Sequence, residues 1–289
     1  MYRFIKNPDP RKNPPFGSIL DPHHPLSHGL VGFLPLNEDG GNIVWDLSTN
    51  ISPLSLDGQT WTPNGLQFNN NGQVFFGVGT YGNLLNGAAG ITLSTSLLAF
   101  DYSPDNYRGR IFGNHIAAGN GIASWLDVAG NLVVGGRSLS TDGFQSATIA
   151  FPGLNRLYHT VGMLDFVNKT ISIYIDGKLV QSTDVTFGGE NYVQGTATLN
   201  DSMGGRENVD LNYYLGQINN FNLFGRSLNE SEIQQLYAEP YANILVPQYW
   251  FMADFGAVAT GWTGKICGVT NPSKICGIAV ADIVKVSGI

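Results

Sequence analysis

The segment from Tyr158 to Gln181 restricts the fold of this chain more than any other, because it reads as three short strands joined by two tight turns. In its middle run, Ile171, Ile173 and Ile175 alternate with polar residues, which predicts one apolar face and one solvent-facing side. An antiparallel sheet must bury its apolar face, and more sheet is the sizeable partner that this sequence offers. We therefore expect half of a sandwich here. The expected strands are Tyr158–Phe166, Thr170–Ile175 and Lys178–Gln181, and the turns are Asn168-Lys169 and Asp176-Gly177.

The composition agrees with an all-β body. The chain has 289 residues, 37 of them glycine, and 13% of its residues are charged, against about 25% in an ordinary globular protein. One sandwich of roughly 200 to 250 residues is common. We therefore predict one main domain with appendages at its two ends.

Several classes of partner and location are not expected. The net charge of -7 and the lack of Lys/Arg clusters argue against nucleic acid. No stretch approaches the roughly 18 apolar residues of a membrane helix, so membrane insertion is not expected. The start of the chain is basic without an apolar segment, so we expect no secretory signal and a protein that stays inside the cell or leaves it by lysis.

Residues 1–26 are predicted to form an extended arm that is either loose or laid on a neighbouring subunit, because proline is dense there. His23, His24 and His28 lie close together in this region, but their spacing does not match a known metal site. We expect no metal from these histidines. The prolines that define the arm are Pro8, Pro10, Pro14, Pro15, Pro22 and Pro25.

Further strands are expected between residues 29 and 149, with Gly130-Asn131 as a hairpin turn between two of them. The longest polar loops are Asp101–Arg108, Leu139–Gln145 and Gly188–Gly195, and loops on a rigid sheet are where function concentrates. The expected strands are residues 29–36, Val44–Ser48, Gly65–Phe68, Gln73–Val78, Ile91–Phe100, Arg110–Gly113, Ile122–Val128, Leu132–Gly135 and Ala147–Ile149.

One helix is predicted after Leu228. Asn229 and Glu232 have the spacing of a capping box, and Ile233, Leu236 and Tyr237 fall on one face that can dock on the sandwich. Pro240 then ends the helix. The helix should therefore close the C-terminal end of the body.

The C-terminal part divides into a linker, residues 242–261, and a tail, residues 262–289, that carries a threefold repeat. Its units are KICGV, KICGI and KVSGI. A unit this short cannot bury its apolar side alone, so it must stack on itself, on the body or on copies from other subunits. Of these we predict assembly with copies from other subunits. Cys267 and Cys276 occupy the position that Ser287 holds in the third unit, which favours a small packed residue over a disulfide. The expected assembly residues are Lys265, Ile266, Val269, Lys274, Ile275, Ile278, Val286 and Ile289.

Three blocks of sequence resemble the laminin-G-like branch of the concanavalin A-like jelly rolls. They are HGLVGFLPLNEDGG with VWDLSTN and GLQFNNN, then LYHTVGMLDFVNKTISIYIDGKLV, and finally LGQINNFNLFGRSLNESEIQQLYAEPY. The resemblance covers residues 27–241 and keeps the order of that family. It implies a two-sheet antiparallel jelly-roll sandwich, a fold shared by lectins, carbohydrate-binding modules, adhesion domains and some glycosidases.

Catalysis is not expected. A glycosidase needs two carboxylates flanking the bond, and the Glu-x-Asp-x-x-Glu strand of the jelly-roll glucanases does not occur in this sequence. Asp101, Asp105 and Asp127 are isolated from one another. No Ser/His/Asp motif, phosphate loop or zinc-spaced cysteine pair is present.

The resemblance also implies a calcium site, because calcium is common in that family. Asp46 matches one acidic position of the family. Where the family often has Ile-Asp-Glu in its last strand, this chain has Ile218-Asn219-Asn220, which removes two charges. We therefore expect no cofactor, with a structural Ca²⁺ at Asp46 as the open alternative.

Binding of a glycan would use an aromatic platform with polar residues beside it. The candidates are loop residues, although each of them is also a plausible ordinary surface residue. Trp45, Trp61 and Trp125 lie in strand patterns and are expected in the core, and His159 is expected to be a hydrogen-bonded strand residue. The glycan candidates are Tyr102, Tyr107, Arg108, Tyr192 and Arg206.

The opening DPHHPLSHGLVGFLPLNE and the ending LYAEPYANI resemble laminin-G-like proteins encoded by bacteriophages, and the repeat tail is similar to the tails of viral structural proteins. This implies a non-enzymatic virion protein, such as a capsid decoration, fibre or adhesin subunit, that is assembled in the host cytoplasm. Its partners would be copies of itself and other virion proteins. The alternative is a carbohydrate-binding module that attaches to host-surface glycans, and a glycoside hydrolase is a remote alternative.

Overall fold

The computed structural model describes residues 3–56, 58–69, 72–102, 109–114, 121–195, 200–205 and 213–248, with the pairs 265–266, 269–270, 274–275 and 278–279. Two compact units divide the chain. One consists of residues 5–246, and the other of residues 1–4 with 247–289. Within the described residues, no helix has both the length and the apolar character that a membrane span requires.

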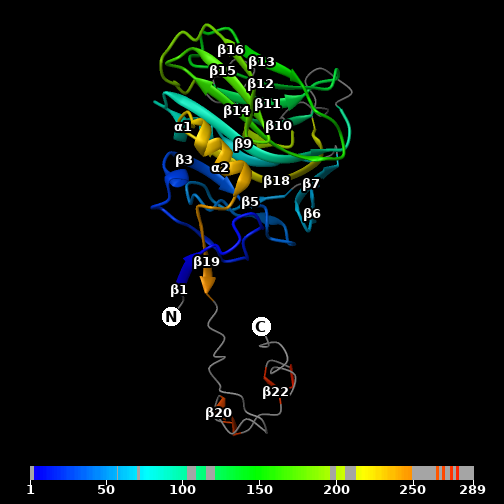
Figure 1. Ribbon diagram of the computed structural model, residues 1–289. Coiled ribbons are helices and arrows are strands. Elements are labelled where there is room, and N and C mark those ends of the chain that lie inside the picture. The colour runs from blue at the N-terminus through cyan, green and yellow to red at the C-terminus, as the bar shows by residue number, and fades with distance from the viewer. Residues whose placement is uncertain are drawn as a thin grey trace. The chain divides into compact units, whose positions relative to one another are not determined.

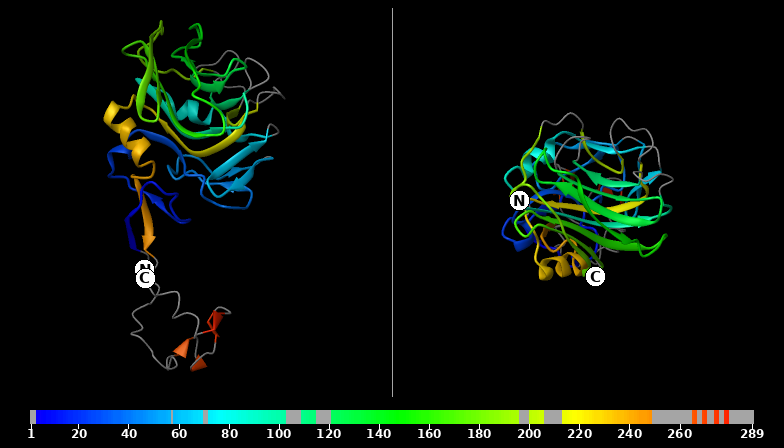
Figure 2. Two further views of the ribbon diagram at one scale, coloured as in Figure 1. Left: turned by 45° about the vertical axis from the view of Figure 1, so that its right-hand side comes forward. Right: turned by 90° about the horizontal axis from the view of Figure 1, so that it is seen from above.

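The larger unit is a sandwich of two antiparallel sheets, seen as stacked curved layers in Figure 2. This confirms the predicted all-β sandwich. We call its first sheet the front sheet. Across the described strands its order is β13-β12-β11-β10-β17-β8, with β8 Val74–Val78, β10 Arg110–Gly113, β11 Gly121–Leu126, β12 Asn131–Arg137, β13 Gln145–Ala150 and β17 Asn200–Met203.

The second sheet, the back sheet, contains the predicted hairpins. Asp176 and Gly177 have φ angles of 49° and 75°, which are the left-handed conformations that a tight two-residue hairpin turn requires. The described strands follow the order β16-β15-β14-β9-β18-β7-β6, and β3 also pairs with β18. Their bounds are β3 Leu30–Leu34, β6 Thr60–Thr62, β7 Gly65–Asn69, β9 Gly90–Ala99, β14 Leu157–Asp165, β15 Thr170–Ile175, β16 Lys178–Asp184 and β18 Leu215–Phe224.

The inner core fills the space between the two sheets, and a group of aromatic rings lies within it. Phe76 and Phe112 come from the front sheet, Phe221 comes from the back sheet, and Tyr81 comes from the helix α1, Thr80–Leu85. Ring centroids are 4.8 Å apart for Phe76 and Tyr81 and 5.0 Å apart for Phe112 and Phe221. Such tilted contacts stabilise a core beyond the area that they bury. The sequence analysis did not predict α1.

A second core lies on the outer side of the back sheet, beneath the helix α2, Glu230–Ala238 (Figure 1). Met163 and Tyr174 of the sheet are buried there with Ile233 and Leu236 of the helix. The prediction that this side of β15 faces solvent is therefore wrong. Alternation of residues identifies the two sides of a strand, but it does not show that an element far along the chain covers the second side.

The predicted capping box of α2 is confirmed. Asn229 Oδ1 accepts a hydrogen bond from the Glu232 N–H at 3.0 Å, and Glu232 Oε2 accepts one from the Asn229 N–H at 2.9 Å. Glu232 also forms a two-pronged ion pair with Arg226, with N–O distances of 2.8 and 2.7 Å. Ile233 and Leu236 are buried as expected, whereas Tyr237 remains 49% exposed.

The proline-rich segment lies on the sandwich rather than apart from it. Leu26 is fully buried in the outer core, Pro10 O accepts from the Tyr241 N–H at 3.0 Å, and Asp21 N–H donates to Asn243 O at 2.8 Å. Residues 5–26 therefore dock on the chain's own body. They were expected to form an arm that is loose or laid on a neighbouring subunit. The elements of this region are β1 Arg3–Lys6, β2 Ile19–Leu20 and the 3-10 turn Pro25–Ser27.

The expected linker is in part a strand, because β19, Ile244–Gln248, pairs with β2. In the tail, each of the first two repeat units forms a short hairpin, in which Ile266 pairs with Val269 and Ile275 with Ile278. Val286 and Ile289 lie outside the described residues. The four short strands are β20 Lys265–Ile266, β21 Val269–Thr270, β22 Lys274–Ile275 and β23 Ile278–Ala279.

Candidate functional site

A band of small residues crosses the outer side of the front sheet. The pairing register places Ser202, Gly113, Ala123 and Gly135 side by side on four neighbouring strands. The residues that alternate with them, such as Phe112 and Ile122, belong to the inner core, so the band faces outward. At one end of the band, Ser202 pairs with the larger Phe75 of β8. At the other end, Gly135 pairs with Ser146 of β13.

Two large side chains lie directly on this band because glycine leaves room for them. A Cβ atom at Gly135 would lie 2.5 Å from the Phe144 ring, and one at Gly113 would lie 2.8 Å from Arg110 Nη1. Both separations are shorter than a real Cβ contact, so the glycines allow the phenylalanine and the arginine to approach the sheet.

Arg110, Trp125, Phe144 and Arg137 form a continuous stack over the front sheet. The Arg110 guanidinium lies 5.3 Å from the Trp125 ring centroid, Trp125 and Phe144 are 6.0 Å apart, and the Arg137 guanidinium lies 6.0 Å from the Phe144 centroid. These are cation–π distances at both ends of an aromatic pair. Arg110 and Trp125 are buried, whereas Phe144 and Arg137 are half-buried and Thr148 beside them is exposed.

Polar atoms on this side of the sheet retain unused hydrogen-bonding capacity. Trp125 Nε1 and Arg137 Nε donate to no acceptor among the residues that the structure describes, and Gln73 Oε1 accepts from no donor there. A buried polar atom without a partner costs free energy.

Asp142 holds the loop that presents Phe144. Its Oδ2 accepts hydrogen bonds from the Ser138 N–H at 3.2 Å, the Ser138 hydroxyl at 2.5 Å, the Leu139 N–H at 3.0 Å and the Gly188 N–H at 3.1 Å. Partial burial would raise the pKa of Asp142, but these donors outweigh it, and the pKa is lowered from its ordinary value. The carboxylate thus ties the residues before Phe144 to the loop after β16.

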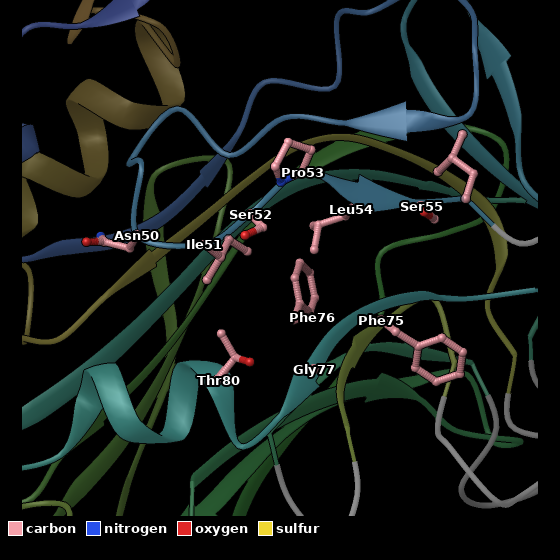
Figure 3. Close-up of a pocket in the computed structure, with 11 residues that line it drawn as sticks. Asn50, Ile51, Ser52, Pro53, Leu54, Ser55, Phe75, Phe76, Gly77 and Thr80 are labelled. Atoms are coloured by element: carbon pink, nitrogen blue, oxygen red, sulfur yellow. The ribbon is translucent and has the colours of Figure 1, made fainter.

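A pocket of about 590 Å³ adjoins the other end of the band, beside β8 (Figure 3). Its second wall is the segment 50–56, which includes β5, Leu54–Ser55, paired with β4, Ile43–Val44. Figure 3 shows Phe76 directed toward Leu54 and Ile51, with Phe75 directed away from them. Phe75 therefore belongs both to the pocket wall and to the band of the front sheet.

Of the predicted glycan-binding residues, the structure describes Tyr102 and Tyr192. Tyr192 is fully buried and lies against Phe166 in the inner core, so its role as a surface platform is corrected. Tyr102 is half-buried, and a Cβ atom at Gly130 would lie 3.1 Å from its ring. Tyr107, Arg108 and Arg206 lie outside the described residues.

Asp46, the residue proposed for calcium, acts as a hydrogen-bond acceptor inside the fold. Its Oδ1 accepts from the Phe33 N–H at 2.9 Å and the Ser48 N–H at 2.8 Å, and its Oδ2 accepts from the Ser48 hydroxyl at 2.8 Å. Burial raises the pKa of this carboxyl despite these donors. Across the described residues, no three His, Cys, Asp or Glu side chains are grouped to hold a metal ion. Both Asp46 carboxylate oxygens thus accept hydrogen bonds from donors of the fold.

The tryptophans only partly follow the expectation of a core location. Trp125 is buried, but on the outer side of the front sheet rather than in the inner core, and Trp45 is 44% exposed. Trp61 is half-buried and donates from Nε1 to Gly41 O at 3.0 Å. His159 is buried and contacts the Ser94 hydroxyl through Nε2 at 2.9 Å, as expected of a strand histidine.

The sequence did not indicate that Arg110, Trp125, Arg137 and Phe144 form one group. The available signal was weak, since three of them lie on three strands and meet only through the pairing register. Phe144 did fall within the loop Leu139–Gln145, which was noted as one of the long polar loops on which function concentrates.

Comparison with protein families gives a match over residues 76–234 to the family described as concanavalin A-like lectin/glucanases superfamily. The chain belongs to this superfamily. The matched residues include the front sheet of this concanavalin A-like domain apart from the first two residues of β8, together with the back-sheet strands β9, β14, β15, β16 and β18. The predicted jelly-roll resemblance is therefore confirmed at the level of the superfamily. A comparison with curated protein sequences gave no match.

Solved structures show the same fold at low sequence identity. The Trypanosoma rangeli sialidase in complex with sialic acid matches with a TM-score of 0.56 and 18% identity, over 74% of this chain and 33% of that one. The botulinum neurotoxin serotype D binding domain matches with a TM-score of 0.55 and 15% identity, over 74% of this chain and 52% of that one. This concanavalin A-like chain thus spans about a third to a half of those proteins, and the likeness concerns the fold alone.

Proposed function

We propose that the outer side of the front sheet binds a saccharide without cleaving it. The observation that supports this proposal most is the stack of Arg110, Trp125, Phe144 and Arg137 on the band of small residues. The half-buried Phe144 ring and the exposed Thr148 would meet the ligand, while Trp125 forms the buried base beneath them.

The chemistry of the group suits a sugar ring. One face of a pyranose is mostly C–H, and it can bury apolar area on an aromatic ring. Hydroxyl groups at the rim of that ring both donate and accept hydrogen bonds. They can accept hydrogen bonds from the Arg137 guanidinium, which lies 6.0 Å from the Phe144 ring centroid.

Binding is favoured over hydrolysis by the positions of the carboxylates. A glycosidase requires two carboxyl groups roughly 5 to 10 Å apart around the bond. Among the described front-sheet strands, the one carboxylate is Asp201. Its Oδ2 accepts from the N–H groups of Tyr81 and Gly82 at the start of α1, which directs it away from the outer side.

A second function, assembly into a virion, is supported by the hairpins of the tail. Two repeat units form the same hairpin with the same register, and repeated short β-units require neighbours to bury their apolar side. We propose that this tail joins copies of the chain with each other and with other virion proteins, assembled in the host cytoplasm. The sandwich would then present its saccharide site to host-surface glycans. Neither nucleic acid nor membrane insertion is part of this proposal.

Saccharide binding is tested with a panel of soluble polysaccharides and the full chain, measured by affinity electrophoresis. Phe144→Ala should abolish retardation by any polysaccharide that retards the native protein. Tyr237→Ala removes an aromatic ring that is 49% exposed on α2, on the back of the sandwich, and serves as the matched control. Equal loss of binding in both variants, or retention in Phe144→Ala, contradicts the proposed site.

Assembly is tested by the mass in solution of the full chain beside a chain that ends at Gly261. The truncated chain keeps the compact unit 5–246. A larger assembly for the full chain and a monomer for the shorter one would support the role of the tail. Monomers in both cases would count against it.

A further inference from the structure

Arg137 presents a positive charge at the proposed saccharide site, and no described residue forms an ion pair with it. Its side chain makes no ion pair or hydrogen bond with any residue in the described part of the chain, and its Nε is buried without an acceptor. We infer that the front-sheet site takes saccharides that carry anionic groups, either carboxylates or sulfates. This inference rests on the proposed function and names the class of ligand for the same site.

The position of Arg137 suits an anion. Its guanidinium lies over the half-buried Phe144 ring, 6.0 Å from the ring centroid. The N–H groups of a guanidinium point outward in its plane, where a carboxylate or a sulfate can accept two parallel hydrogen bonds. A sugar ring that contacts Phe144 would place a charged substituent at this edge.

The nearest acidic residue in the sequence, Asp142, forms no ion pair with Arg137 among the described residues. Its Oδ2 instead accepts hydrogen bonds from Ser138, Leu139 and Gly188 within the loop. The chain as a whole carries a net charge of -7 and would repel an anionic polysaccharide at long range. An anionic saccharide must therefore be attracted by a charge at the site itself. Arg137 supplies that charge and would determine the selectivity for anionic ligands.

The test uses two matched pairs of polysaccharides with the full chain at about 0.15 M salt, where long-range effects are screened beyond roughly 8 Å. Dextran is compared with dextran sulfate, and methyl-esterified pectin is compared with its de-esterified form. We expect at least one charged member to bind ten or more times more tightly than its neutral counterpart. Selectivity for the sulfated or for the carboxylated pair identifies which anion the site takes.

Variants separate a local contact from a general charge effect. Arg137→Gln should reduce binding of the charged polysaccharide to the level of the neutral one, and Arg137→Lys should restore part of it. Arg156→Gln removes the same charge from an exposed arginine that lies 5.1 Å from the Tyr158 ring centroid, and it should leave binding unchanged.

The outcomes distinguish this inference from the function on which it rests. Equal binding of charged and neutral partners, or equal loss in the Arg137 and Arg156 variants, overturns the anionic ligand and leaves saccharide binding standing. Failure of every polysaccharide in both pairs and in the wider panel overturns both.

Discussion

Asp201 Oδ2 accepts a hydrogen bond from the Tyr81 N–H at 2.6 Å, and this contact joins β17 to α1 across 120 residues of sequence. The carboxylate is 1% exposed, and burial raises its pKa to about 7 even though two backbone N–H groups oppose that shift. The contact fixes the first turn of α1, which carries Tyr81 into the inner core.

The burial of Asp201 predicts a pH-dependent stability. The folded pKa lies above the ordinary value of 3.8, so between about pH 4 and pH 7 the unfolded chain binds fewer protons, and the free energy of unfolding falls as pH rises. Asp201→Asn should remove this dependence, which is on the order of 2 kcal/mol. Urea denaturation of the native protein and of Asp201→Asn at pH 5 and pH 8 measures this difference in the free energy of unfolding. The same pH dependence in both proteins would refute the role of Asp201.

The ion pair of Arg226 with Glu232 should stabilise the docking of α2. It is two-pronged and mostly buried, with side-chain exposures of 22% and 16%, and Arg226 Nε also donates to His28 O at 2.8 Å. Arg226→Ala should therefore lower the free energy of unfolding by about 1 to 3 kcal/mol. Lys12→Ala, which breaks the exposed pair with Asp9, should lower it much less, because solvent screens an exposed pair. Similar urea midpoints for the two variants would show that the pair contributes no more than a surface pair.

Gly135 is predicted to be required for the position of Phe144. In Gly135→Ala the new methyl group would meet the Phe144 ring and Gln145 O, both at 2.5 Å, so the ring must move and stability should fall by about 1 to 3 kcal/mol. Saccharide binding should fall with it. Gly143→Ala in the same loop meets nothing closer than 3.6 Å and should change neither. Thermal unfolding with affinity electrophoresis checks both variants, and full binding by Gly135→Ala would argue against the stacked position.

Asp142 is expected to act as a positioning residue. Asp142→Ala removes the acceptor shared by Ser138, Leu139 and Gly188, so the loop that presents Phe144 should exchange its amide hydrogens faster and bind saccharide more weakly. Asp127→Ala is a suitable control, because Asp127 accepts from the Asn131 N–H at 2.8 Å at the other end of β12. If both variants weaken binding equally, the effect comes from general loosening of the strand.

Features set by neighbouring residues could be predicted from the sequence, and features set by distant pairing could not. The turn at Asp176-Gly177 and the capping box of Asn229 and Glu232 depend on residues within four positions of each other, and both are confirmed. The burial of Tyr174 depends on α2, which lies more than fifty residues further along the chain. Alternation alone could not show that cover.

The candidate site could not be predicted from the sequence either, because it also depends on pairing between strands that are distant in the sequence. Arg110, Trp125 and Phe144 come together through the register of β10, β11 and β12 and through the space above Gly135. The density of proline before Leu26 indicated little regular structure, but it did not indicate that this segment docks on its own sandwich. The helix α1, with the sequence TYGNLL, is too short to show a helical period.

Hydrogen exchange of the full chain, with and without the polysaccharide that binds it most tightly, tests the central proposal most directly. If the outer side of the front sheet is the site, the ligand should slow exchange in peptides that contain Arg137 and Phe144 and leave α2 and β16 unchanged. Protection confined to α2, to β16 or to the segment 50–56 would contradict a saccharide site on the front sheet.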